Sequence, residues 1–327
     1  MTELHAAPSH IQEGSQIHVG RFRGAIANPN VTAPGGRWRL KEWNYLSIVT
    51  ETHFVAFAVV QLGYVANLFC YVVDRQTHAV WQMEAMSAFG VGLEIAPSSL
   101  DGRTIWTRGA NRVEIEAIPR GWRVDLAVRL GDKWLRGSAA IDRGEGLGLV
   151  FPLAPGRLAY THKDAGMLAE VQLTLDDQPL PRHGLATLDW TRSAALRTTR
   201  WNWASTSTLL PDGRRFGLNL SAHVYDNVSG ASEENTVWLD GRLHPLGGVT
   251  FSLPASPGSE TWHVRGAGID LAFSPLGARQ QNVNLGLVRS RFVQPYGHFA
   301  GTVTLPDGEE LLIPPAFGVV EDHFAVW

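Results

Sequence analysis

The chain has very little of the residue types that build several common sites. Cys70 is its only cysteine among 327 residues, which excludes an internal disulfide and a cysteine-based zinc site. Lysine occurs only at Lys41, Lys133 and Lys163, against 25 arginines. Charged residues make up 18 %, too few for a disordered chain. The formal net charge of −3 gives no overall attraction to nucleic acid or to an anionic membrane.

Long hydrophobic runs and familiar cofactor motifs are also missing. Residues 1–15 are polar and lack the apolar segment of a targeting peptide. The most apolar stretch, Phe54–Val73, is interrupted by polar residues and glycine, so it predicts two paired strands and no stable membrane insertion. We therefore expect a cytoplasmic protein. No G-x-S-x-G, H-E-x-x-H or phosphate-binding glycine motif is found, which gives no reason to expect a metal or a nucleotide cofactor.

Turn-forming and aromatic residues are plentiful. The chain contains 34 glycines, 18 prolines and 12 tryptophans. Arg112–Ala117 and Arg123–Leu130 alternate polar and apolar residues, which is the pattern of half-buried strands. Many short antiparallel strands must close into barrels or pair as sandwiches, because open sheet edges aggregate. The tryptophans fill a core or line a cavity for an apolar ligand, and the sequence leaves both possibilities open.

Three pairs of segments recur in the same order, at spacings of 158, 156 and 164 residues. They are Trp43-Asn44 and Trp201-Asn202, Trp106–Pro119 and Trp262–Pro275, and Gly137–Asp142 and Gly301–Asp307. This self-similarity predicts an internal duplication. We expect an N-terminal extension over residues 1–35, a first β-barrel-like domain over 36–155 and a second over 156–327.

Two clusters contain candidate acids and bases. Tyr160–Asp164 brings His162, Lys163 and Asp164 together, as a proton-transfer group or as a solvated turn. Asp189 lies between Leu188 and Trp190, and partial desolvation there would raise its pKa toward that of a general acid. The alternative for Asp189 is a structural ion pair with Arg192, Arg197 or Arg200.

Further candidates follow in the second half. Trp201 and Trp203 share one strand face and would either shield a cation or pack in the core. Asn219, Ser221, His223 and Tyr225 alternate with apolar residues, so they line a polar lumen or face solvent. The polar residues Glu234, Asn235 and His244 follow closely.

These segments, taken together, resemble the domain-of-unknown-function family 2804. The resemblance covers about residues 36–327 and rests on motifs in the same order. They are Thr161–Asp164, Leu188–Arg192, Trp201–Ser205, Gly217–Leu220, Glu234-Asn235, Asp240–His244, Trp262, Tyr296–Gly301 and Phe317–Glu321. More distantly, the chain is similar to paired lipocalin-like barrels such as carotenoid hydratases and tocopherol cyclase. That resemblance implies an all-β fold of two tandem lipocalin-like antiparallel barrels and chemistry on long apolar substrates.

The expected function is acid-assisted hydration, cyclisation or isomerisation of an apolar, lipid- or isoprenoid-like molecule, without a cofactor. Asp189 would protonate an alkene or polarise an oxygen of the substrate, and His162 or His244 would relay protons. Lys163 or Arg192 would hold a charged head group or steady Asp189. The predicted substrate-binding residues are Asp164, Trp190, Arg192, Trp201, Trp203, Asn219, Glu234 and Asn235. A non-catalytic carrier or sensor of apolar molecules and a purely structural module are the alternatives, and the oligomeric state stays open.

Overall fold

The computed structural model describes residues 4–266, 268–284, 286 and 288–327, and it is almost entirely β-structure. The one helix among the described residues is a single 3-10 turn, Arg37–Arg39. Both alternating segments are strands, within β11 (Asn111–Ile118) and β12 (Gly121–Leu130). The all-β prediction is confirmed, and the period-two pattern identified strands correctly.

The chain divides into two compact units after Ala195, and not at the expected position near residue 155. The reason is hydrogen bonding: β15 (Arg157–Leu175) and β17 (His183–Ser193) complete the first unit's sheet, where they connect β13 (Lys133–Asp142) to β5 (Lys41–Thr50). From His5 onward, the predicted N-terminal extension also belongs to this unit, since β4 (Gly20–Arg23) pairs with β14 (Leu147–Ala154).

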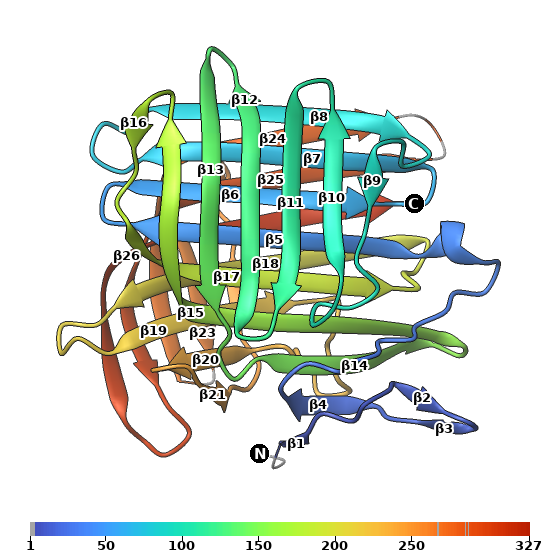
Figure 1. Ribbon diagram of the computed structural model, residues 1–327. Helices are drawn as coiled ribbons and strands as arrows, with labels where there is room; N and C mark the ends of the chain where they lie inside the picture. Colours follow the sequence, from blue (N-terminus) through green and yellow to red (C-terminus); the bar gives the residue numbers. More distant parts are fainter. Residues whose placement is uncertain (1–3, 267, 285, 287) are drawn as a thin grey trace. The chain divides into compact units, whose positions relative to one another are not determined.

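The sheet of the first unit runs in the order β8-β7-β6-β5-β17-β15-β13-β12-β11-β10-β9. Its other strands are β6 (His53–Gln61), β7 (Val65–Asp74), β8 (Val80–Ala88), β9 (Leu93–Glu94), β10 (Arg103–Arg108), β1 (His5–Ala6) and β16 (Gln178–Pro179), while β2 (Gln12–Glu13) and β3 (Gln16–Ile17) pair separately. Figure 1 shows β5–β8 running across β10–β13, so the sheet curls over its own core.

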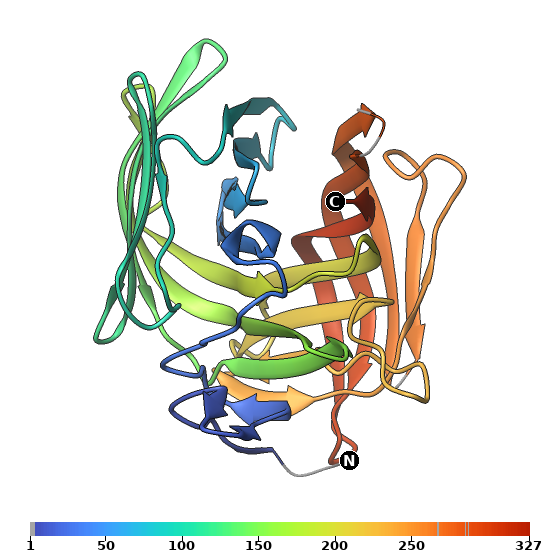
Figure 2. The same cartoon turned by 90° about the vertical axis from the view of Figure 1, so that its right-hand side faces the viewer.

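The second unit has a sheet in the order β21-β20-β19-β18-β26-β25-β24-β23-β22. Its strands are β18 (Thr198–Leu209), β19 (Arg215–Ala222), β20 (Thr236–Leu239), β21 (Arg242–Pro245), β22 (Thr250–Ser252), β23 (Trp262–Gly266), β24 (Ile269–Asn284), β25 (Arg289–Thr304) and β26 (Glu310–Val326). Figure 2 shows the long strands β24–β26 running alongside one another.

The two sheet orders support the duplication. The strands β5–β8 correspond to β18–β21, and β15 and β17 correspond to β25 and β26. At the other edge β9–β11 correspond to β22–β24, so the hairpin of β12 and β13 is extra in the first unit. The repeats at Trp43/Trp201 and Trp106/Trp262 occupy matching places. The third does not, because Gly137 lies in the extra hairpin and Gly301 lies in β25.

Each unit has its own hydrophobic core, and large aromatic side chains fill much of both. Trp106, Trp122 and Trp190 are at most 2 % exposed in the first core. In the second core Phe273 and Phe299 pack with ring centroids 4.7 Å apart. The sequence alone allowed the tryptophans either to fill a core or to line a cavity. The structure shows that several of them pack in a core.

Candidate active site

Asp189 and Lys163 form a buried ion pair in the first unit. The antiparallel register of β15 and β17 places the two residues directly opposite each other. Lys163 Nζ lies 2.5 Å from Asp189 Oδ2. The indole Nε1 of Trp43 and the hydroxyl of Thr191 donate to Oδ1, at 3.3 and 3.0 Å. Asp189 does form an ion pair, but with Lys163 and with none of the three arginines considered from the sequence.

Both members of this ion pair are buried. The side chain of Lys163 is 4 % exposed and that of Asp189 is 12 % exposed. Removing two opposite charges from water is costly, and their mutual attraction offsets that cost only while both partners are present.

An aromatic row extends from Asp189 across the neighbouring strands. Tyr45 is opposite Asp189, and Ala58 connects Tyr45 to Phe69 along the next two strands. Ring centroids are 6.5 Å apart for Tyr45 and Phe69, and 6.3 Å for Phe69 and Tyr71. All three rings are buried. The buried ion pair thus adjoins an apolar aromatic surface, built from tyrosine and phenylalanine rather than from the predicted tryptophans.

Strand alternation places His162 and Asp164 on the opposite face from Lys163. The imidazole of His162 is fully buried, with Nδ1 2.9 Å from Ser99 Oγ. Burial, and then the charges of Arg143 and Lys163, lower its pKa to about 3, so the ring is neutral near pH 7. Asp164 accepts a hydrogen bond from the backbone N–H of Gly144 at 2.8 Å. The structure therefore places neither residue beside Asp189.

Trp190 and Arg192 also lie on the core face. The ring of Trp190 packs 5.8 Å from that of Tyr160, and the guanidinium of Arg192 lies 5.5 Å from the indole. Arg192 forms an ion pair with the buried Glu42, at 2.7 Å. Arg192 is thus held by Glu42 and does not contact Asp189.

The second unit contains a related carboxylate that sequence reasoning missed. The indole Nε1 of Trp201 donates to Glu321 Oε1 at 2.7 Å, and the amide of Gln294 donates to Oε2 at 2.9 Å. In the strand registers Trp43 is opposite Thr191, and Trp201 is opposite His323. Asp189 lies two residues before Thr191, and Glu321 lies two residues before His323. Glu321 therefore matches Asp189, with Gln294 in the place of Lys163.

Three of the remaining predicted residues are linked to one another by hydrogen bonds, and Asn235 bonds to the neighbouring strand. The indole of Trp203 donates to Asn219 Oδ1 at 2.8 Å, and the amide of Asn219 donates to Glu234 Oε1 at 3.2 Å. Asn235 accepts from the backbone N–H of Ser221 at 2.7 Å. All lie in the second unit, as does His244 in β21. The polar alternation of β19 ends with the strand at Ala222, and His223 beyond it is exposed.

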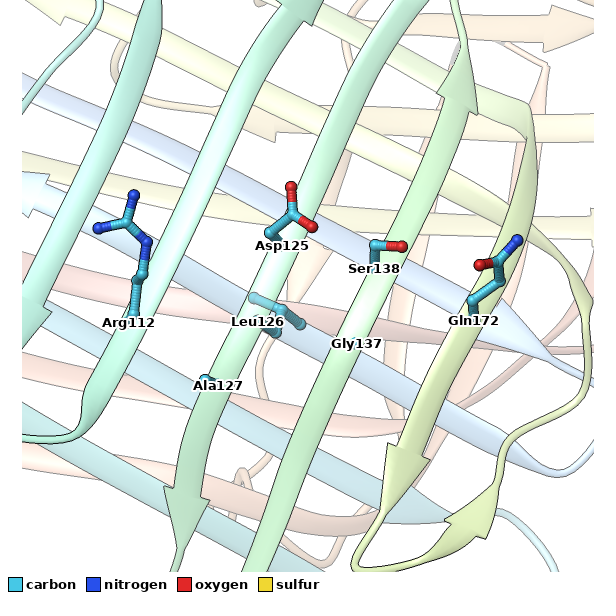
Figure 3. Close-up of a pocket in the computed structure, with 7 residues that line it drawn as sticks. All are labelled: Arg112, Asp125, Leu126, Ala127, Gly137, Ser138 and Gln172. Carbon is cyan, nitrogen blue, oxygen red and sulfur yellow. The ribbon is translucent and has the colours of Figure 1, made fainter.

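Two clefts of the structure are lined by neither Lys163 nor Asp189. One, of about 260 Å³, is lined by Val31–Ala33, Gly36, Arg37, Leu40, Glu42 and Arg192. The other, of about 370 Å³, lies on the face from which Arg112, Asp125, Ser138 and Gln172 project (Figure 3). Neither is lined by a tryptophan. Within the described residues, no cluster of three or more His, Cys, Asp or Glu side chains is arranged to bind a metal, and no helix is long and apolar enough to cross a membrane.

Comparison with protein families decides the relationship. Residues 3–327 match the model of the domain of unknown function DUF2804. The chain belongs to this family. The resemblance inferred from the motifs is therefore confirmed, and it extends over almost the whole length of this DUF2804 protein. No curated protein matches it.

Solved structures of similar fold share little sequence with this DUF2804 protein. CghA, crystallised with Sch210972, has a TM-score of 0.51 and 10 % identity, covering 97 % of each chain. Kievitone hydratase from Nectria haematococca has a TM-score of 0.46 and 10 % identity, covering 88 % of each chain. The likeness to CghA supports the predicted fold of two tandem lipocalin-like units and extends no further.

Proposed function

We propose that this protein is an enzyme that binds an apolar, lipid- or isoprenoid-like molecule and protonates it. The products would be those of hydration, cyclisation or isomerisation, formed without a cofactor. The observation that carries the proposal is the buried Lys163–Asp189 pair at the end of the aromatic row of Tyr45, Phe69 and Tyr71. A proton source and an apolar surface are what the addition of a proton to an alkene requires.

The carboxyl group of Asp189 is the acid in this proposal. Its O–H bond breaks as a C–H bond forms on the substrate, and a carbocation results. The electron-rich ring faces of Trp43 and Tyr45 are suited to stabilising that charge. The cation then takes up water, which loses a proton, or it loses a proton from a neighbouring carbon. The released proton goes to the carboxylate of Asp189, directly or through solvent, and this restores the acid, while the ammonium of Lys163 holds the carboxylate in place. Such a positioned acid contributes about 10²–10⁴-fold to the rate.

The test is product formation from a panel of acyclic isoprenoids, polyenes and unsaturated fatty acids, followed by chromatography and mass spectrometry. We expect Asp189→Asn to lower turnover about 100-fold or more while the affinity for the ligand is retained. The matched control is Asp101→Asn, which alters an exposed carboxylate of the same unit and leaves turnover unchanged. Equal turnover in Asp189→Asn and in the wild type would contradict the proposed acid.

The same panel tests the alternative of a carrier or sensor. A carrier needs the aromatic row but no proton donor. Ligand that is bound by the wild type and recovered chemically unchanged would favour that function, and would also show that the Lys163–Asp189 pair is structural.

A further inference from the structure

His323 in the second unit is held by rings and by polar contacts. Its ring centroid lies 4.2 Å from that of Trp201, 5.2 Å from that of Phe292 and 6.4 Å from that of Trp327. The side chain is 14 % exposed. The imidazole thus sits in an aromatic environment, with part of its surface still open.

The two ring nitrogens of His323 face different partners. Nε2 lies 2.9 Å from the hydroxyl of Ser290, and Nδ1 lies 3.7 Å from Glu321 Oε1. Glu321 is itself fixed by the indole of Trp201 and the amide of Gln294. A hydroxyl, an imidazole and a carboxylate therefore follow one another in the order that activates a serine nucleophile.

The matching positions in the first unit lack both reactive groups. In β17 the counterpart of His323 is Thr191, which pairs with Trp43 as His323 pairs with Trp201. Counting along the corresponding registers, the counterpart of Ser290 in β15 is Ala159. The carboxylate is present in both units, whereas the serine and the histidine that touch each other occur only in the second.

We propose that Ser290, His323 and Glu321 form a nucleophile, base and positioning acid that hydrolyse an apolar ester. Ser290 Oγ attacks the acyl carbon, and His323 takes the hydroxyl proton and passes it to the departing alkoxide, which leaves as an alcohol. Water then attacks the acyl-serine and releases the carboxylic acid, with His323 again taking the proton and returning it to Ser290. The rings of Trp201, Phe292 and Trp327 favour an aliphatic or aromatic acyl group.

An activity-based probe tests the site without knowledge of the natural substrate. The full-length protein is treated with a long-chain alkyl fluorophosphonate, and the labelled peptide is identified by mass spectrometry. We expect the label on Ser290 and none in Ser290→Ala, a small change at a half-buried residue. His323→Gln should lower the labelling rate constant about 100-fold or more. Ser252→Ala, on an exposed residue of the same unit, is the matched control and should label like the wild type.

Two variants of Glu321 test whether its carboxylate positions His323, with the rate of Ser290 labelling as the readout. Glu321→Gln should slow labelling, and Glu321→Asp should restore part of the rate. Asp189→Asn should label like the wild type, which separates this activity from the proposed protonation. Failure of the folded wild type to label, or a label that persists in Ser290→Ala, would overturn the inference.

Discussion

The indole N–H of Trp201 binds the carboxylate of Glu321 in the same register position in which Trp43 binds Asp189. In both units a tryptophan on the first strand of the repeat anchors an acid on the neighbouring strand. The third partner differs, because it is an ammonium group beside Asp189 and an amide beside Glu321. A carboxylate therefore occupies the same place in both units, and the groups that contact it differ.

The Lys163–Asp189 pair should be strongly coupled in stability. Asp189→Asn leaves a buried ammonium without its counter-ion and should lower the free energy of unfolding by about 3–5 kcal/mol. Adding Lys163→Met removes the stranded charge, so the double variant should be more stable than Asp189→Asn alone. Urea unfolding of the four proteins measures the coupling. Additive losses in the double variant would show that the two side chains do not interact.

His162 should make the protein less stable in mild acid. Its pKa is lowered in the folded state, first by burial, so the unfolded chain binds a proton more readily. The stability that depends on neutral His162 is thus fully present above about pH 6.5. It is lost as the pH falls toward about 3, at roughly 1.4 kcal/mol per pH unit. Urea unfolding between about pH 7 and about pH 4.5, which covers the upper part of this range, measures how steeply the free energy of unfolding falls. His162→Asn should flatten it, and an unchanged slope in that variant would assign the loss to other groups.

The extra hairpin of the first unit should depend on Gly137. Its φ is +118°, and an added Cβ would lie 2.0 Å from the backbone oxygen of Gln172. Gly137→Ala should therefore cost about 3 kcal/mol or more. Gly109→Ala is the matched control: φ is +59° and open space surrounds the Cβ position, so the cost should be about 1 kcal/mol. Thermal or urea unfolding compares the two, and equal losses would contradict the close strand approach.

The two tryptophans that donate to the carboxylates should contribute differently to the free energy of unfolding. Trp201→Phe removes a 2.7 Å hydrogen bond to a buried carboxylate and should cost about 1.5–3 kcal/mol. Trp43→Phe removes a 3.3 Å bond and should cost less. Urea unfolding of both variants decides the order, and a larger loss in Trp43→Phe would show that the indole N–H groups do not set the effect.

The sequence predicted the fold class better than the site, for physical reasons. Alternation along single strands is local, so Arg112–Ala117 and Arg123–Leu130 were identified as strands without further knowledge. Which residues face one another depends on the register between strands far apart in the chain. The pairing of Lys163 with Asp189 and of Trp201 with Glu321 follows from such registers.

The domain boundary and the sheet faces illustrate the same limit. Nothing in the composition around Pro152–Tyr160 shows that β15 and β17 pair back to β5 and complete the first unit's sheet. Alternation did predict that Asp189 and Trp190 lie on opposite faces, but not that Trp190 would face a core. The repeat at Trp43 and Trp201 was the one feature of the sequence that pointed toward the paired carboxylates.

The most direct test of the central claim is deuterium transfer to an apolar substrate in heavy water. We expect the wild-type protein to add one deuteron from solvent at a single carbon of a converted isoprenoid or polyene, and Asp189→Asn to add none at a comparable rate. Nuclear magnetic resonance of the product identifies the carbon. Deuterium transfer that is as fast in Asp189→Asn as in the wild type, or a substrate that binds and returns without deuterium, would contradict the account.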